Sequence, residues 1–371
     1  MSHDPEEPSR LRSSSEPSAD RPRVETAFVE STAEEPIPAE ILSRRICDFD
    51  LRIEGRPLEK LIERFRAELT ARGITRLQPR FYLSDEWGVP EGTVAIGIPF
   101  YLADPELVRV QAQHGGLVEG EGAEDILRYL RHEMGHVVNY AYRLHATEEW
   151  TNLFGPMSRP YAETYRVVPF STDFVRHLPG GYAQKHPDED WAETFAVWMT
   201  PELDWRALYE DSPGALAKLE YCERTFPSIN ARDPEITETQ IDDEVGAIRT
   251  TLQEYYGATV LGAVSIPHSL DGDLQVIFAR RAASASPDVK RSGDAALLLR
   301  RQQDSLVRSV YRWTGVEPAL LYQLVQHLAE RAKVMGISYA LDERDPILVE
   351  LSGFLTALGM NYAYTGKFIA S

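Results

Sequence analysis

Apolar residues recur at helical spacing in three stretches of the first 200 residues. Between Pro57 and Arg72 they occupy one helical face, and Gly73 ends the run. The run from Asp125 to Tyr142 is strongly helical as well. A third helix is predicted to begin at Pro187, because three acidic residues follow and suit the positive end of a helix dipole, and to end before Pro201.

Two shorter segments predict strands. Arg80 to Leu83 and Thr93 to Leu102 are apolar, β-branched or aromatic, and are bounded by Gly and Pro. Val94 to Phe100 is a candidate edge strand that would pair with an extended peptide, because Pro99 suits an edge better than a central position. An ordinary core strand is an equally good interpretation. Helices and short strands together predict an α+β fold.

The pattern changes beyond Pro227 and becomes mainly helical. After a linker-like stretch we expect a helix from about Thr237 through Tyr256, a hairpin of Ala258 to Ile266 and Leu274 to Arg280, a linker at Ala282 to Pro287, and helices at Ala295 to Trp313, Glu317 to Met335 and Pro346 to Leu358. No metal or nucleotide motif occurs there. This part is predicted to be a helical scaffold or a partner-binding module.

Composition divides the chain into three parts. Residues 1–40 are rich in proline, serine and acidic side chains and poor in apolar ones, which predicts a disordered tail. Residues 41–232 form one predicted domain, and residues 233–371 form a second, mainly helical one.

The clearest chemical signal is a His-Glu-x-x-His motif inside the helix that ends at Tyr142. His132 and His136 project from one face of that helix, one turn apart, and can share a zinc ion. Glu133 flanks the same face and is placed to take a proton from a zinc-bound water. The pattern is typical of zinc peptidases. Because it also occurs by chance, a third ligand must be identified.

A hydrolytic zinc site uses three protein ligands and leaves the fourth position to water. The metzincin pattern requires glycine and histidine where Asn139 and Tyr142 stand, which excludes that class. His145 would point away from the motif histidines if the helix continued, and it is not expected to bind metal unless the helix ends near Tyr142. The remaining candidate is an acidic residue on the helix that begins at Pro187.

On that helix Glu189 falls within the apolar stripe, Glu193 lies on its flank, and Asp190 lies almost opposite. A carboxylate directed into a core needs compensation. Zinc would compensate Glu189, and a hydrogen bond to the far nitrogen of a ligand histidine would compensate Glu193 and fix the tautomer of that ring. A solvated acidic first turn, stabilised only by the helix dipole, is the alternative. The upstream histidine pair favours Glu189 as the ligand.

The residues named above resemble those of a known protein family. The run Ser171 to Met199, the helix around the motif and the stretch Phe81 to Leu102 resemble the bacterial putative zinc-binding metallopeptidase family. The motif followed by a Glu-x-x-x-Glu helix is similar to gluzincins, in particular the catalytic domain of lethal-factor-type toxins. Those enzymes use the first glutamate of that helix as a ligand and place a tyrosine seven residues before it near the metal, which matches Glu189 and Tyr182. The resemblance covers about 160 of the 371 residues and implies a zincin-like domain with a small mixed sheet and active-site helices.

The expected activity is zinc-dependent hydrolysis of peptide bonds. His132, His136 and Glu189 would hold one Zn²⁺, and Glu133 would act as general base toward the water and then protonate the leaving amine. Tyr182 would stabilise the oxyanion, since it lies in a Gly-Gly turn from which it could swing in; a packing role is the alternative. Two other histidines nearby are expected to stabilise loops: His177 and His186.

Composition limits the partners. The 39 basic and 58 acidic residues give a net charge of -19, which disfavours nucleic acid. No apolar run is long enough to span a membrane, no secretory signal is recognised, and Cys47 and Cys222 do not suggest a disulfide framework. We therefore expect a cytoplasmic protein with a polypeptide substrate and no membrane partner, with a possible protein partner for the C-terminal helices. Secretion without a cleaved signal stays open.

A second hypothesis is a catalytically inactive zincin-like protein that serves as an interaction or scaffold module. The complete set of ligands, base and tyrosine favours the enzyme, because an inactive relative tends to lose the base or a ligand.

Overall fold

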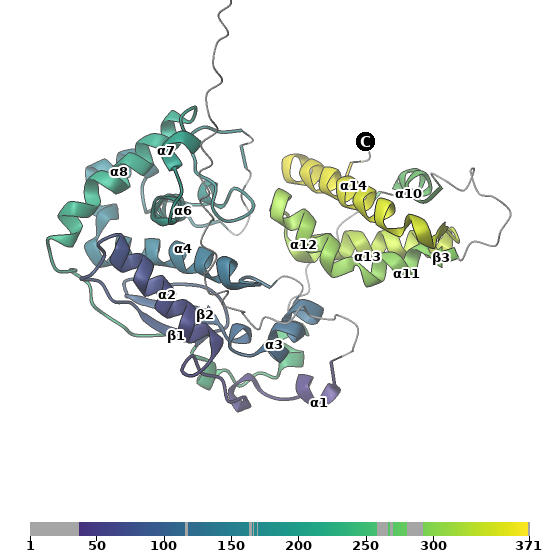
Figure 1. The fold of residues 1–371 in the computed structure, drawn as a ribbon, viewed down its shortest axis with the longest axis horizontal. Coiled ribbons are helices and arrows are strands. Elements are labelled where there is room, and N and C mark those ends of the chain that lie inside the picture. Colours follow the sequence, from purple (N-terminus) through teal and green to yellow (C-terminus); the bar gives the residue numbers. More distant parts are fainter. Residues whose placement is uncertain are drawn as a thin grey trace, which may run out of the picture.

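The computed structural model describes residues 37–115, 118–162, 165, 167–168, 170–257, 266–267, 270–279 and 292–369. These residues form two lobes, each with its own hydrophobic core (Figure 1). Almost all of the predicted N-terminal tail, the first strand of the predicted hairpin except Ile266, and the linker at 282–287 lie outside the described residues.

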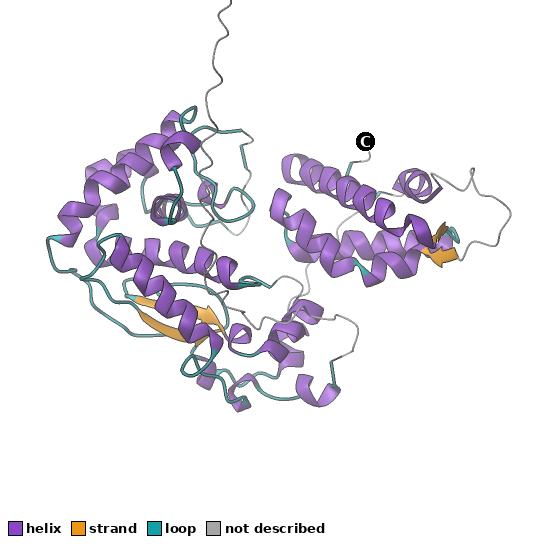
Figure 2. Ribbon diagram, in the orientation of Figure 1, coloured by secondary structure: helices purple, strands orange, loops and turns teal. Residues whose placement is uncertain are grey.

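The first lobe is built mainly of helices around one short parallel strand pair (Figure 2). Its α-helices and strands are α1 Ala39–Leu42, α2 Pro57–Ala71, β1 Arg80–Ser84, β2 Ala95–Pro99, α3 Pro105–Val110, α4 Ala123–Tyr142, α5 Glu148–Phe154, α6 Pro187–Met199, α7 Trp205–Leu208, α8 Pro213–Asn230 and α9 Leu252–Gly257. Short 3₁₀ helices occur at Ile46–Asp48, Phe100–Ala103, Leu144–Ala146, Tyr182–Gln184 and Val245–Ala247, and a π-helical turn at Gln111–Gly115.

Three of these helices match the sequence predictions closely. Helix α2 begins at a proline and buries its predicted apolar face, which consists of Leu58, Leu61, Ile62, Phe65 and Leu69. Helices α4 and α6 lie side by side, with α2 and the strands on the other side of α4 (Figure 1). The α4–α6 pair positions the candidate site, because the His-Glu-x-x-His motif is buried on α4 and the Glu-x-x-x-Glu segment is buried on α6.

Among the described residues, β2 belongs to a two-stranded sheet and therefore lies at a sheet edge, as predicted. One side of β2 pairs in parallel with β1, from Arg80 opposite Ala95 onward. On the other side the chain after β1 folds back, and the Gly97 N–H donates to the Gly88 carbonyl at 2.8 Å. Every residue of β2 is buried. The other side of β2 is thus covered by a single bridge, and its pairing with an extended peptide stays a prediction. The strand ends earlier than predicted, because the chain turns into a 3₁₀ helix at Phe100.

The predicted helix from Thr237 through Tyr256 is mostly absent. Residues 238–244 are irregular and lie along the strands: the N–H of Val94, directly before β2, donates to the Glu238 carbonyl at 2.7 Å, and the side chains of Arg80 and Ser84 in β1 donate to other carbonyls of the segment. Within the predicted helix only Leu252–Gly257 is α-helical. Leu252 is fully buried in the core of the first lobe. Residues that were expected to start the C-terminal domain at 233 thus pack with the first lobe.

The second lobe is helical with one short antiparallel pair (Figure 2). Its elements are α10 Leu270–Ala279, β3 Ser292–Asp294, α11 Ala295–Arg301, α12 Gln303–Thr314, α13 Pro318–Val334, β4 Ser338–Ala340, a 3₁₀ turn at Leu341–Glu343, and α14 Arg344–Thr365. The second strand of the predicted hairpin is instead helix α10, whose Leu270, Leu274 and Phe278 are buried in this core. The helix predicted at Ala295 to Trp313 is divided into two at Gln302.

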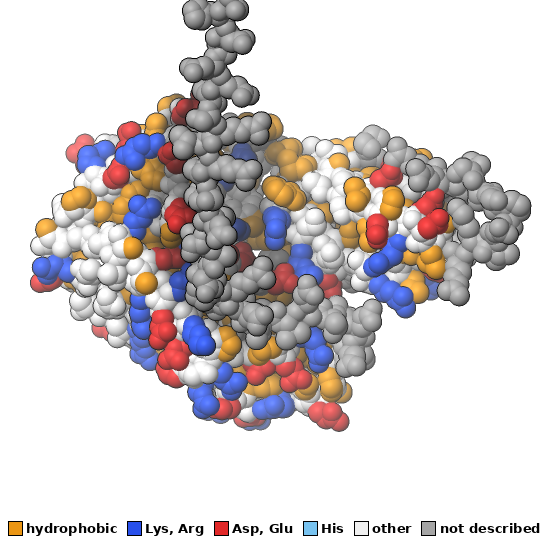
Figure 3. All heavy atoms as spheres, in the orientation of Figure 1, with side chains coloured by type: hydrophobic (Ala, Val, Ile, Leu, Met, Phe, Trp, Pro, Cys, Tyr) orange, Lys and Arg blue, Asp and Glu red, His pale blue; other side chains and the backbone are white. Residues whose placement is uncertain are grey.

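Acidic and basic side chains are interspersed over the visible face of the first lobe (Figure 3). Among the described residues, none of the helices combines the length and the apolar character needed to cross a bilayer.

Candidate metal centre

Helix α4 presents the two motif histidines on the face that meets α6. His132 and His136 are both buried, and their Nε2 atoms lie 3.2 Å apart. The spacing of four residues places the rings one turn apart on the same side of the helix. Two imidazole nitrogens thus face one point in the interior.

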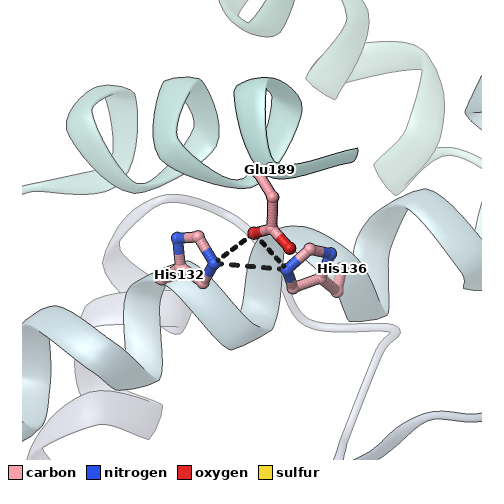
Figure 4. Close-up of side chains that lie close together, drawn as sticks. All are labelled: His132, His136 and Glu189. Carbon is pink, nitrogen blue, oxygen red and sulfur yellow. Dashed lines mark hydrogen bonds and ion pairs between the residues drawn. The ribbon is translucent and has the colours of Figure 1, made fainter. Parts of the chain in front are cut away.

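Helix α6 supplies a carboxylate to the same point. The Glu189 Oε2 atom lies 3.0 Å from His132 Nε2 and 3.4 Å from His136 Nε2 (Figure 4). Glu189 sits in the first turn, which begins at Pro187 and is capped by the His186 ring accepting from the Asp188 N–H. Figure 4 shows Glu189 reaching down from α6 between the two histidines of α4.

The two helices approach closely because the motif contains a glycine. A Cβ atom added to Gly135 would lie 2.7 Å from the Ala192 Cα. The Trp191 indole N–H donates to the Gly135 carbonyl at 2.7 Å and fastens the crossing. A larger side chain at this crossing would hold Glu189 away from the histidines.

The three donor atoms fit a zinc ion. His132, His136 and Glu189 form a group that could hold a metal ion. In a tetrahedral zinc site with bonds of about 2.0–2.2 Å, two ligand atoms lie about 3.3–3.6 Å apart. The observed separations of 3.2, 3.0 and 3.4 Å are within a few tenths of an ångström of that edge. Two nitrogens and one carboxylate oxygen are also a donor set that zinc favours.

Each histidine has a carboxylate on its far side. The His132 Nδ1–H donates to Glu193 Oε1 at 2.9 Å, which is the hydrogen bond the sequence predicts. The His136 Nδ1–H donates to Asp188 Oδ2 at 3.0 Å. In these tautomers both Nε2 atoms keep a lone pair directed at the shared point, as metal ligation requires.

The partner of His136 was missed by sequence reasoning. Asp188 was interpreted only as a charge at the helix terminus, but its side chain is buried and also accepts hydrogen bonds from Asn139 at 2.7 Å and Tyr140 at 2.6 Å. Asn139 and Tyr140 follow the motif on α4 by three and four residues, so the same helical spacing that identifies His136 could have indicated them.

The electrostatics favour a cation at this point. Burial opposes protonation of His132, but the carboxylates of Glu189 and Glu193 outweigh it and raise its pKa to about 9. The pKa of His136 is likewise raised, against the effect of burial, by Asp188 and Glu189. The pKa of the Glu189 carboxyl is lowered well below its ordinary value, since the two histidines outweigh the cost of its burial. A divalent cation that displaces protons from the histidines would meet the same demand for positive charge.

Glu133 lies beside the histidines and is buried. Burial raises the pKa of its carboxyl, while His132 and His136 oppose that shift. A carboxyl whose pKa is raised holds a proton more readily than an exposed one.

Two tyrosines lie next to Glu189. The Tyr182 ring is 5.6 Å from the His132 ring between centroids, so the turn at Gly181, with its left-handed φ of 65°, brings Tyr182 to the site. Tyr161 was not found from the sequence, where no motif marks it. Its hydroxyl donates to Glu189 Oε1 at 2.6 Å and lies 3.4 Å from the Tyr182 hydroxyl. The second carboxylate oxygen is thereby engaged, which leaves Oε2 toward the histidines.

Among the described residues, no other histidine joins His132 and His136 in this group. Helix α4 does end at Tyr142, with Arg143 in a left-handed conformation, so the argument from a continuing helix fails for His145. His145 nevertheless turns to Asn139, 3.2 Å from its Oδ1. His177 and His186 contact the carbonyls of Arg128 and Arg159, as expected for histidines that stabilise loops.

Comparison with known families agrees with this geometry. Residues 101–205 match the family described as putative zinc-binding metallo-peptidase. The matched segment contains α4 and α6 entire, and with them all three donor residues. It is shorter than the resemblance suggested, since it begins after the strands and leaves out nearly all of the stretch from Phe81 to Leu102. Comparisons with curated proteins and with solved structures gave no match.

Proposed function

We propose that this chain is a zinc-dependent metallopeptidase of the gluzincin type, with a zincin-like first lobe. The observation that carries the proposal is the convergence of His132 Nε2, His136 Nε2 and Glu189 Oε2 within 3.4 Å of one another, each ring held by a carboxylate behind it. The match to a zinc-binding peptidase family over the same helices supports it.

The donor set would hold one Zn²⁺, with Glu193 and Asp188 fixing the two rings. A bound zinc ion would supply a Lewis acid that makes a water acidic near neutral pH and polarises a carbonyl group. Glu133 would accept the proton of that water and deliver it to the nitrogen of the leaving amine. The Tyr182 hydroxyl would donate a hydrogen bond to the carbonyl oxygen as negative charge develops on it.

The substrate we propose is a polypeptide, because these groups provide one base, one proton carrier and one oxyanion donor, as water-mediated cleavage of an amide requires. No side chain needs to form a covalent intermediate. The helical second lobe remains predicted as a scaffold or a partner-binding module.

Metal analysis and one substitution test the proposal. We expect about one zinc per purified chain, and we expect Glu133→Gln to retain the metal while losing hydrolysis of a peptide library. Glu106→Gln, on the exposed face of α3, is the matched control and should behave as the wild type. A zinc-free protein, or activity that survives Glu133→Gln, would refute the proposal and favour an inactive interaction module.

A further inference from the structure

We propose that Lys185 is a positioning residue for Tyr182: it holds the Tyr182 hydroxyl and places a positive charge beside the oxyanion that this hydroxyl would stabilise. The inference deepens the proposed function and rests on it. Lys185 belongs to no motif, and sequence reasoning did not single it out.

Local backbone geometry brings the two side chains together. Tyr182–Gln184 form a 3₁₀ helix and Lys185 follows directly. Residues three apart eclipse each other in a 3₁₀ helix, so Lys185 stands over Tyr182. Its ammonium donates to the Tyr182 hydroxyl oxygen at 3.4 Å. The same nitrogen lies 4.4 Å from the centre of the Tyr161 ring and 5.0 Å from that of Tyr182.

The charge of Lys185 is held on aromatic rings instead of being neutralised in an ion pair. Among the described residues, no carboxylate oxygen lies within 4.0 Å of its ammonium. Lysine on the protein surface ordinarily extends into water, and fixing it between two phenols costs side-chain entropy that the cation–π contacts offset. A cation held in this way keeps its charge close to the Tyr182 hydroxyl.

The geometry sets the size of the effect. An oxyanion that accepts from the Tyr182 hydroxyl would lie about 3 Å beyond it, and so about 6 Å from the ammonium. For two unit charges at that distance, effective dielectric constants between those of water and a protein surface correspond to a rate effect of roughly three- to hundredfold. The attraction exists only when the oxyanion forms, so it should act on kcat more than on KM.

Lys185 could instead only keep the turn in shape, and four variants distinguish the two roles. Lys185→Met removes the charge and keeps the length, and we expect kcat to fall roughly tenfold with KM and zinc content unchanged. Lys185→Arg, which keeps the charge and can stack on the same rings, should recover most of the rate. Tyr182→Phe removes the hydroxyl that Lys185 holds, so Lys185→Met should slow Tyr182→Phe less than it slows the wild type, and the double variant should lose less than the sum of the two single effects.

A binding assay with a phosphonamidate tests the role of Lys185 without a known substrate. Zinc-loaded protein is titrated with a phosphonamidate peptide, whose tetrahedral anion imitates the oxyanion, and Lys185→Met should weaken its binding roughly tenfold. Lys60→Met, on the exposed face of α2, is the matched control and should bind as the wild type.

Several results would overturn the inference. They are an unchanged kcat and phosphonamidate affinity in Lys185→Met, additive effects in the double variant, or no binding of the phosphonamidate by the wild type. The first two can occur while Glu133→Gln still loses hydrolysis and keeps zinc, in which case the proposed function stands and only the role of Lys185 fails.

Discussion

Replacing Gly135 with alanine tests whether the close crossing of α4 and α6 builds the metal centre. The new Cβ would lie 2.7 Å from the Ala192 Cα, 3.1 Å from the Ala192 carbonyl oxygen and 3.2 Å from its Cβ. Two of these three contacts are with backbone, which no change of rotamer can relieve. Carbon atoms rest about 3.5–4.0 Å apart, so α6 must move away by roughly 1 Å.

The displacement is large compared with what a metal site tolerates. Ligand distances must stay within about 0.2 Å of their ideal values, and Glu189 would move with the helix that carries it. We expect zinc affinity to fall roughly 10- to 100-fold, comparable to the loss of an outer group that orients a ligand. Overpacking should also cost about 1–3 kcal/mol of folding stability.

Gly353 supplies the control. It lies on the exposed side of α14, where an added Cβ meets no atom within 4 Å. Gly353→Ala should therefore stabilise the protein by about 0.5–1 kcal/mol, because alanine is the better helix former. Competition with a chelating dye measures zinc affinity, and urea unfolding measures stability. If Gly135→Ala binds zinc as the wild type does and matches Gly353→Ala in stability, the helix crossing does not set the ligand geometry.

Three further substitutions test neighbouring contacts. Tyr161→Phe removes the hydrogen-bond donor to the second carboxylate oxygen of Glu189, and Asp188→Asn weakens the hydrogen-bond acceptor behind His136. Each substitution should lower zinc affinity roughly 10- to 100-fold in the dye assay. An unchanged affinity would show that the contact does not support zinc binding. Lys218→Met leaves buried Asp190 without the ammonium 2.6 Å away and should cost about 3–5 kcal/mol in urea unfolding. Adding Asp190→Asn should recover part of that loss, and no recovery would contradict the ion-pair explanation.

The parts of the fold that were predicted well have strong local signals. Helix α2 begins at Pro57 and α6 begins at Pro187, as predicted, because a proline is favoured at the first helical position and the apolar spacing that follows is regular. The prediction of α4 to Tyr142 is also correct at its C-terminal end. In these helices the sequence pattern and the tertiary packing require the same conformation.

The parts that were missed depend on contacts between distant segments. The segment after Thr237 has helical spacing, yet it lies along the strands, where the Val94 N–H donates to the Glu238 carbonyl. How far the outer side of β2 is covered depends on the return of Gly88 along it. No periodicity within a segment reports such pairing, since tertiary contacts override local preference.

Helix α6 shows why the helical projection of its acids was incomplete. Asp190 lies almost opposite the apolar stripe, which suggests solvent, but it is 2% exposed because α8 covers that side and presents Lys218. The projection correctly indicates which side of the helix each carboxylate occupies. The projection cannot indicate that both sides of α6 are covered by other helices. It therefore does not show that Asp190 is buried as well as Glu189.

The balance of buried charge shows that the two motif histidines lie in strongly acidic surroundings, which favour positive charge at this point. Among the described residues, six carboxyl side chains are buried but only two basic side chains, and two acids are neutralised in the pairs Glu68–Arg131 and Asp190–Lys218. The four remaining acids surround the two histidines: Glu133, Asp188, Glu189 and Glu193. Burying four carboxylates without compensation is unfavourable, and positive charge at the two histidines offsets part of that cost, beside hydrogen bonds such as those that Glu193 accepts from the N–H groups of His177 and Leu178. That positive charge can come from two protonated histidines or from a divalent ion bound to neutral histidines, and the ion would carry both charges at one point, between the donor atoms that converge on it.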